Sequence, residues 1–159
     1  MTDFQVQALD ASFVHRAKMR FDEGAADVRL VEVDKPTGFP CRVTLQWAQP
    51  GERILLFRHR PFEGQSPYAE EGPVFARLDA VETTLPANAL PAYISDIALV
   101  SVRGYDEAIS IIHAETTPGS DCGMAIRRAF ENPDVEFLQV RSATHGCFQF
   151  RVDRASANH

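Results

Sequence analysis

Residues Pro40–Leu78 read PCRVTLQWAQPGERILLFRHRPFEGQSPYAEEGPVFARL, and this segment organises the rest of the chain. It contains three apolar runs, which are Val43–Trp47, Ile54–Phe57 and Val74–Leu78. A Pro-Gly dipeptide separates the first two runs, and a loop rich in Pro, Gly and Ser separates the last two. This punctuation predicts a strand, a tight turn, a second strand, a long loop and a third strand.

Two of these runs have different apolar patterns. Val43, Leu45 and Trp47 alternate with polar residues, which is the period of a half-buried strand. Ile54–Phe57 is apolar at every position, so we expect both faces of this strand to be covered and the strand to lie at the centre of a sheet. The short connection through Pro50-Gly51 predicts that the two strands form an antiparallel hairpin.

Other segments also carry the patterns of strands. We expect strands at 4–9, 29–33, 98–102, 109–114, 135–141 and 147–153. The last two form a pair, with Phe148, Phe150 and Val152 on one face of their strand.

Two segments carry the patterns of helices. Asp10 or Ser12 can cap a short helix after the first strand. The clearest helix is Asp121–Glu131, which Ser120 can cap and which Asn132-Pro133 ends. The sequence therefore predicts a single α+β domain at 1–154, with a mainly antiparallel twisted β-sheet and one well-defined helix packed on one face. The tail at 155–159 is expected to be frayed.

Composition and charge exclude several classes of function. The 159 residues are 45% hydrophobic and include eleven Phe, which is enough for one packed core. The net charge of -6, without a cluster of Lys or Arg, argues against nucleic acid as a partner. No apolar run approaches the length of about 20 residues that a membrane span needs. We expect no membrane association, and the sequence leaves a homodimer open.

The cysteines and the N-terminus indicate the cellular compartment. Three cysteines without CxxC spacing, after an N-terminus MTDFQVQALD that lacks the features of a secretory signal, predict reduced thiols in a cytoplasmic protein. The side chains that could bind zinc share no recognised ligand spacing, so we expect no metal and no cofactor. They are Cys41, His59, His113, Cys122, His145 and Cys147.

Six short motifs occur in a fixed order along the chain. They are Pro40-Cys41-Arg42, Pro50-Gly51-Glu52, Ser66-Pro67-Tyr68, Gly72-Pro73-Val74-Phe75, Arg103-Gly104-Tyr105 and Gly146-Cys147-Phe148. Together they resemble an uncharacterised bacterial family, domain-of-unknown-function family 1203, from about Gly38 to Arg154. The resemblance implies that His59 occupies a position where members of this family usually have His. Arg141 replaces a frequent His, and Thr144-His145 replaces a commonly basic pair, which weakens any site that depends on this turn.

The loop Arg58–Pro73 is the segment closest to function. A segment of this length without a regular period is uncommon in a compact domain unless it is functional or mobile. It carries His59, Ser66 and Tyr68, whose polar groups can orient a ligand. Alternatively, Tyr68 and Phe62 anchor the loop on the sheet. Ser66 lacks the GxSxG context of a nucleophile.

Three arginines lie beside rigid Pro or Gly residues at the ends of strands. Arg42, Arg77 and Arg103 can each grip a carboxylate or phosphate with two hydrogen bonds. We expect the loop to form one wall of a concave site that contains Tyr68 and either Arg42 or Arg77. In the alternative, the arginines form structural ion pairs. Their expected partners are Glu52, Asp79 and Asp106.

Cys147 is the candidate nucleophile, because a neighbouring base such as His145 lowers the pKa of a thiol. Adjacent strand residues point to opposite faces, however, which favours an inert thiol. The leading functional hypothesis is a small-molecule binding domain, with the loop over a pocket that holds an anionic group. The alternatives are an enzyme that uses His59 with Cys147 or Tyr68, and a protein-interaction domain without a pocket.

Overall fold

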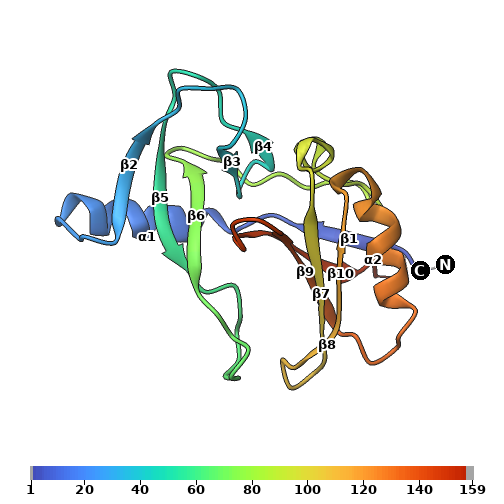
Figure 1. The fold of residues 1–159 in the computed structure, drawn as a ribbon. Helices are drawn as coiled ribbons and strands as arrows, with labels where there is room; N and C mark the ends of the chain where they lie inside the picture. Colours follow the sequence, from blue (N-terminus) through green and yellow to red (C-terminus); the bar gives the residue numbers. More distant parts are fainter. Residues whose placement is uncertain (1, 157–159) are drawn as a thin grey trace.

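The chain forms two five-stranded sheets that lie side by side, with one α-helix at each end of the molecule (Figure 1). The computed structural model describes residues 2–156. The elements are β1 (Phe4–Gln7), α1 (Ala11–Asp22), β2 (Val28–Glu32), β3 (Pro40–Cys41), β4 (Gln46–Trp47), β5 (Arg53–His59), β6 (Gly72–Arg77), η1 (Ala92–Asp96), β7 (Val100–Tyr105), β8 (Ile111–Thr117), η2 (Gly119–Asp121), α2 (Cys122–Phe130), β9 (Phe137–Ser142) and β10 (Phe148–Arg154). The α+β class is confirmed, with two sheets where the sequence predicted one.

Sheet A has the strand order β1-β10-β9-β7-β8, and all neighbours are antiparallel. The predicted pairing of the last two strands is confirmed, because β9 and β10 are neighbours. Helix α2 packs on one face of the sheet, where Ile126 and Phe130 join the same core as Val140 and Phe150. This helix forms because apolar residues recur at helical spacing, and it ends before Pro133.

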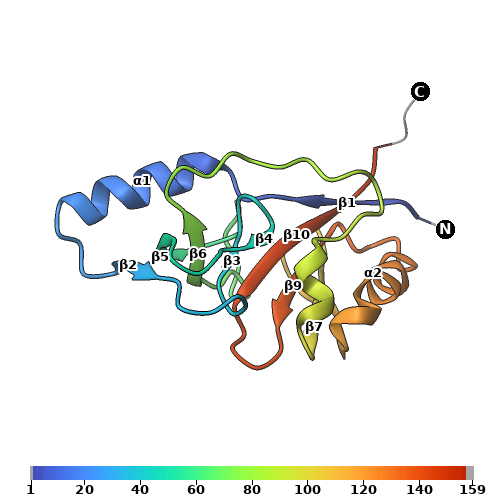
Figure 2. The ribbon, with the colours of Figure 1, turned by 90° about the horizontal axis from the view of Figure 1, so that it is seen from above.

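Sheet B has the strand order β2-β5-β6-β3-β4, and β3 runs parallel to β6. As predicted, β5 is an interior strand, because it pairs with β2 and with β6. Helix α1 covers this sheet with Val14 and Ala17, which pack against Leu55 and Phe57. Figure 2 shows α1 and α2 at opposite ends of the molecule, with β10 running between them.

The strand predicted at Val43–Trp47 is wrong for residues 43–45, and only its last two residues, Gln46–Trp47, form a strand, β4. Residues 42–45 form a turn between β3 and β4, in which Leu45 has a φ of 56°. Val43 is buried in the core of sheet B and Leu45 in the core of sheet A. Two buried residues that face two different cores produce the same alternation as a strand with one buried face. The predicted hairpin with β5 is therefore also wrong, since β4 pairs with β3.

The helix caps match the sequence at one helix only. Asp10 caps α1, and its carboxylate accepts a hydrogen bond of 2.8 Å from the amide of Ser12. The expected cap of α2 by Ser120 is wrong, because Ser120 lies inside η2 and α2 has no side-chain cap. The 3-10 turn leads directly into the helix, so Asp121 takes the capping position instead.

A β-bulge in β10 connects the two sheets. The register with β9 shifts between Phe148 and Phe150, so the two side chains do not share one face as the alternation predicted. Phe150 and Val152 lie in the core of sheet A, whereas Phe148 lies in the core of sheet B. An extra residue in a bulge turns the following side chains to the other face.

The loop between β5 and β6 is shorter than the sequence predicted and covers residues 60–71. Phe62 anchors it, with its ring 5.3 Å from that of Tyr105. At the C-terminus, the amide of Ala155 donates to the carbonyl of Asp3 at 2.9 Å, and the rest of the predicted frayed tail, 157–159, lies outside the described residues. Within residues 2–156, neither helix combines the length and the apolar character of a bilayer span.

Candidate functional site

A cavity of about 530 Å³, the Arg42 cavity, lies where the two sheets meet. Its apolar wall consists of Phe39, Trp47, Leu56, Phe75 and Ile97. Its polar side chains are Lys35, Arg42, Ser142, Thr144, His145, Cys147 and Gln149. Among residues 2–156, no Asp or Glu contributes to the lining, so the fixed charges that these residues bring to the cavity are positive.

Arg42 is the buried charge of this cavity. It is 2% exposed, its Nε donates to the carbonyl oxygen of Phe148 at 2.8 Å, and its Nη1 donates to the carbonyl oxygen of Pro40 at 2.7 Å. Within residues 2–156, no carboxylate lies within 4.0 Å of the guanidinium, and Nη2 has no hydrogen-bond partner. Burial lowers the pKa of Arg42, although a guanidinium keeps its proton at neutral pH. The positive charge is thus desolvated and has no counter-charge.

The side chains around Arg42 are fixed by a chain of hydrogen bonds. The indole N–H of Trp47 donates to Asp96 Oδ2 at 2.9 Å, and its ring lies 4.9 Å from that of Tyr93. The hydroxyl of Tyr93 donates to Gln149 Oε1 at 3.0 Å. Gln149 Nε2 in turn donates to the carbonyl of Cys147 at 3.3 Å. Hydrogen bonds therefore position Trp47 on the apolar wall and Gln149 on the polar side of the cavity.

The thiol of Cys147 lines the same cavity and is partly exposed, whereas Cys41 and Cys122 are fully buried. Its Sγ lies 3.8 Å from the carbonyl oxygen of His145. The imidazole Nδ1 of His145 pairs instead with Thr144 Oγ1 at 3.1 Å. No base is in hydrogen-bond contact with the thiol within the described residues, so none of these residues is placed to take its proton directly.

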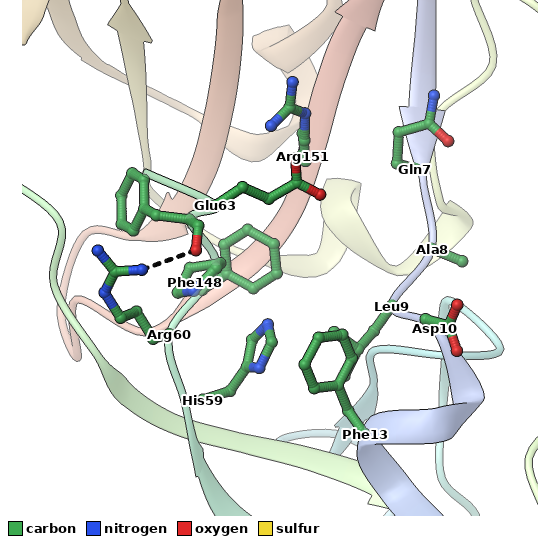
Figure 3. Close-up of a pocket in the computed structure, with 12 residues that line it drawn as sticks. Gln7, Ala8, Leu9, Asp10, Phe13, His59, Arg60, Glu63, Phe148 and Arg151 are labelled. Carbon is green, nitrogen blue, oxygen red and sulfur yellow. Dashed lines mark hydrogen bonds between the residues drawn. The ribbon is translucent and has the colours of Figure 1, made fainter. Parts of the chain in front are cut away.

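A second cavity of about 220 Å³, the His59 cavity, lies between the end of β5, the start of α1 and β10 (Figure 3). The ring of His59 makes an edge contact with Phe13 at 4.5 Å between centroids and lies 6.2 Å from the ring of Phe148. Burial, together with the charges of Arg16 and Arg42, lowers the pKa of His59 from 6.5 to about 4. His59 is therefore neutral at pH 7.

The structure separates the residues that the sequence grouped as one site. Arg42 and Cys147 line the Arg42 cavity, and His59 lines the other. Tyr68 is 46% exposed and lines neither cavity, so the expected wall containing Tyr68 with Arg42 or Arg77 is not formed there. Within the described residues, His59, Cys147 and Tyr68 share no hydrogen bond, and His59 and Cys147 line different cavities.

The remaining candidates, Arg77, Arg103 and Ser66, form structural ion pairs or hydrogen bonds. Arg77 pairs with Glu52 at 3.1 Å, one of the carboxylates expected from the sequence. Arg103 pairs with Glu70 at 3.0 Å, which replaces the expected Asp106. The hydroxyl of Ser66 donates to the carbonyl oxygen of Ile109 at 2.8 Å and so ties the 60–71 loop to the β7–β8 connection.

Sequence reasoning missed part of the site. Trp47 and Gln149 were not candidates, because Trp47 was expected on the core face of a strand and Gln149 carries no motif. One signal could have indicated Trp47: it lies in a segment where apolar and polar residues alternate, and such alternation fits a turn as well as a strand. Within residues 2–156, no three His, Cys, Asp or Glu side chains converge on a common point where a metal could bind.

Fold and site define an α+β domain with a positively charged cavity at the junction of two sheets. The chain belongs to the family of proteins of unknown function DUF1203, whose model matches residues 38–154. No curated protein and no solved structure matched the chain. Every residue of the Arg42 cavity except Lys35 falls within the matched region, whereas the His59 cavity also uses residues 7–13, which precede it.

Proposed function

We propose that the protein binds a small molecule that carries an anionic group, with the anion at Arg42 and an apolar body along Trp47 and Phe75. One observation carries this proposal: a buried guanidinium lines a cavity that contains no carboxylate. An isolated buried charge costs several kcal/mol, and an anionic ligand would offset that cost by pairing with it.

The size and lining of the cavity suit such a ligand. A volume of about 530 Å³ lies within the range of about 300–1,000 Å³ typical of small-molecule sites. Nη2 of Arg42 is the donor left for the anion, and Lys35 and His145 add polar groups to the lining. Burial of about 100 Å² of apolar ligand surface against the aromatic wall contributes about 2.5 kcal/mol.

We propose further that the protein works in a bacterial cytoplasm. Three free cysteines, one of them partly exposed, suit a reducing compartment. The resemblance of the six motifs to a bacterial family supports the bacterial origin.

A thermal-shift experiment tests the binding proposal. The probes are hexanoate and hexyl phosphate, and the control is hexanamide, which has the same apolar body without a charge. All samples are matched in ionic strength with chloride. We expect both anions to raise Tm clearly more than hexanamide does at the same concentration, because all three bury a similar apolar body but only an anion pairs with the charge of Arg42.

Two variants assign the effect to one arginine. Arg42→Gln should abolish the shift, whereas Arg77→Gln, whose parent side chain pairs with Glu52, should retain it. If Arg42→Gln does not fold, Arg42→Lys replaces it and should weaken the shift. Equal stabilisation by hexanoate and hexanamide, or an undiminished shift in the Arg42 variants, would refute the proposal.

A further inference from the structure

His59 is a largely buried polar side chain whose ring nitrogens have no hydrogen-bond partner within residues 2–156. It is 7% exposed, and neither ring nitrogen makes a hydrogen bond to any residue of the described part of the chain. Its imidazole points into the His59 cavity, between Phe13 and Phe148 (Figure 3). Buried polar groups in folded proteins nearly always have a hydrogen-bond partner, and His59 lines the cavity, so a molecule bound in the cavity can supply that partner.

The lining of the His59 cavity combines aromatic side chains with equal numbers of acidic and basic side chains. The lining contains two acids, Asp10 and Glu63, and two bases, Arg60 and Arg151. Three of these four charges are engaged: Asp10 accepts from the amide of Ser12, Arg60 donates to two carbonyls of its own loop, and Arg151 pairs with Asp153. In contrast to the Arg42 cavity, this lining offers no buried cation to an anion.

From this geometry we propose that the His59 cavity binds a small uncharged planar ring compound, of one or two fused rings, that carries an N–H or O–H group hydrogen-bonded to His59. A neutral imidazole presents one donor and one acceptor, so it can accept the ligand's proton. Aromatic walls favour a ring, since aromatic pairs contribute about 0.5–1.5 kcal/mol beyond the area they bury. A cavity of about 150 Å³ holds benzene, and the volume of about 220 Å³ of the His59 cavity leaves room for a second ring.

This site is independent of the proposed anion site. The two cavities share no lining residue, and the Arg42 cavity contains a buried cation where the His59 cavity contains a neutral imidazole. A failure of either proposal therefore leaves the other standing.

The test uses indole and indene, which have the same fused-ring shape and differ in the N–H group. The ring ¹⁵N resonances of His59 are followed by NMR in the folded parent protein during titration with each probe. We expect indole to shift these resonances saturably and to bind about fivefold or more tightly than indene, which corresponds to one buried hydrogen bond. Indene should leave the ¹⁵N resonances of His59 nearly unchanged.

A variant pair supports the assignment. His59→Phe should bind indole and indene equally, whereas His15→Phe, at an exposed position of α1, should behave like the parent. Absence of a saturable His59 shift with indole, or equal affinity for indole and indene in the parent, would overturn the proposal. Because the resonances are measured in the parent, the test does not depend on the variant folding.

Discussion

Arg42 Nε donates a 2.8 Å hydrogen bond to the carbonyl oxygen of Phe148 and thereby joins the β3–β4 turn of sheet B to β10 of sheet A. The two residues also separate the two cavities, since Arg42 lines one of them and the ring of Phe148 lines the other. A hydrogen bond to a charged group contributes about 1.5–3 kcal/mol to stability. Arg42 therefore has a structural role through Nε and Nη1, and Nη2 is the part left for a ligand.

Tyr105→Phe should stabilise the protein. The hydroxyl of Tyr105 is fully buried and has no hydrogen-bond partner within the described residues, while its ring stacks on Phe137 at 5.0 Å. Removal of an unsatisfied buried hydroxyl should raise the free energy of unfolding by about 1–2 kcal/mol. Tyr93→Phe is the matched control: it removes the hydrogen bond to Gln149 and should lower the free energy by about 1 kcal/mol. Urea denaturation measures both, and a loss of stability in both variants would contradict this assignment.

The low pKa of His59 predicts acid-dependent stability. Burial and the charges of Arg16 and Arg42 lower its pKa from 6.5 to about 4, so as the pH falls the unfolded chain binds this proton before the folded protein does. The neutral His59 therefore contributes up to about 3 kcal/mol to the free energy of unfolding. This contribution is fully present above pH 6.5 and is lost as the pH falls toward 4. His59→Asn removes this contribution, so the free energy of unfolding should fall less steeply between pH 6.5 and 4. His15→Asn, which changes an exposed histidine, should keep the parental slope; identical slopes for all three proteins would count against a buried neutral His59.

Gly119 holds the start of α2 against η1. A Cβ at this position would overlap the carbonyl oxygens of Ile94 and Ile97, which are backbone atoms and cannot rotate away. Gly119→Ala should therefore cost about 1–3 kcal/mol or more. Gly72→Ala is the control, because no atom lies within 4 Å of a Cβ there, and it should be nearly neutral. Similar midpoints of urea denaturation for the two variants would show that the η1 contact is looser than described.

The apolar periodicity and the capping residues of short segments predicted several helices and strands correctly. The apolar run of β5, the pair of β9 and β10 and the cap at Asp10 all follow from neighbouring residues. The arrangement into two sheets did not, because it depends on the parallel contact of β3 with β6 and on a bulge that turns Phe148 toward sheet B. No residue type encodes such long-range pairing.

The site was predicted in part for the same reason. Arg42 and Cys147 were candidates by residue type, and they line one cavity. Arg42 and Cys147 lie in the same cavity because Arg42 is hydrogen-bonded to Phe148, the residue after Cys147. Arg42 and Phe148 are 106 positions apart in the sequence, so no local spacing reveals this contact. Tyr68 was an attractive candidate because a loop with Pro and Gly often carries function, yet the loop is tied down by Ser66 and Phe62 and leaves Tyr68 in solvent.

Cys147 should be the one thiol that reacts rapidly in the folded protein. Cys41 and Cys122 are 0% exposed, whereas Cys147 lines the Arg42 cavity. Ellman's reagent should label one thiol rapidly in the native protein and all three after unfolding. Hexanoate should slow the labelling of Cys147 more than hexanamide does at the same concentration, because its charge holds it more tightly in the same cavity. Cys147→Ser should lose the rapid phase; three rapid thiols, or equal rates with both compounds, would contradict the description of the cavity.

The intrinsic fluorescence of Trp47 tests the central claim most directly. Trp47 is the only tryptophan of the chain, and it lines the Arg42 cavity, so its emission reports on occupancy without a label. Titration with hexanoate should change the emission saturably in the parent and in Arg77→Gln, and hexanamide should have no comparable effect. Arg42→Gln should show no saturable change with hexanoate. A saturable change of the same affinity in Arg42→Gln, or an equal response of the parent to hexanamide, would contradict the assignment of the cavity as an anion site.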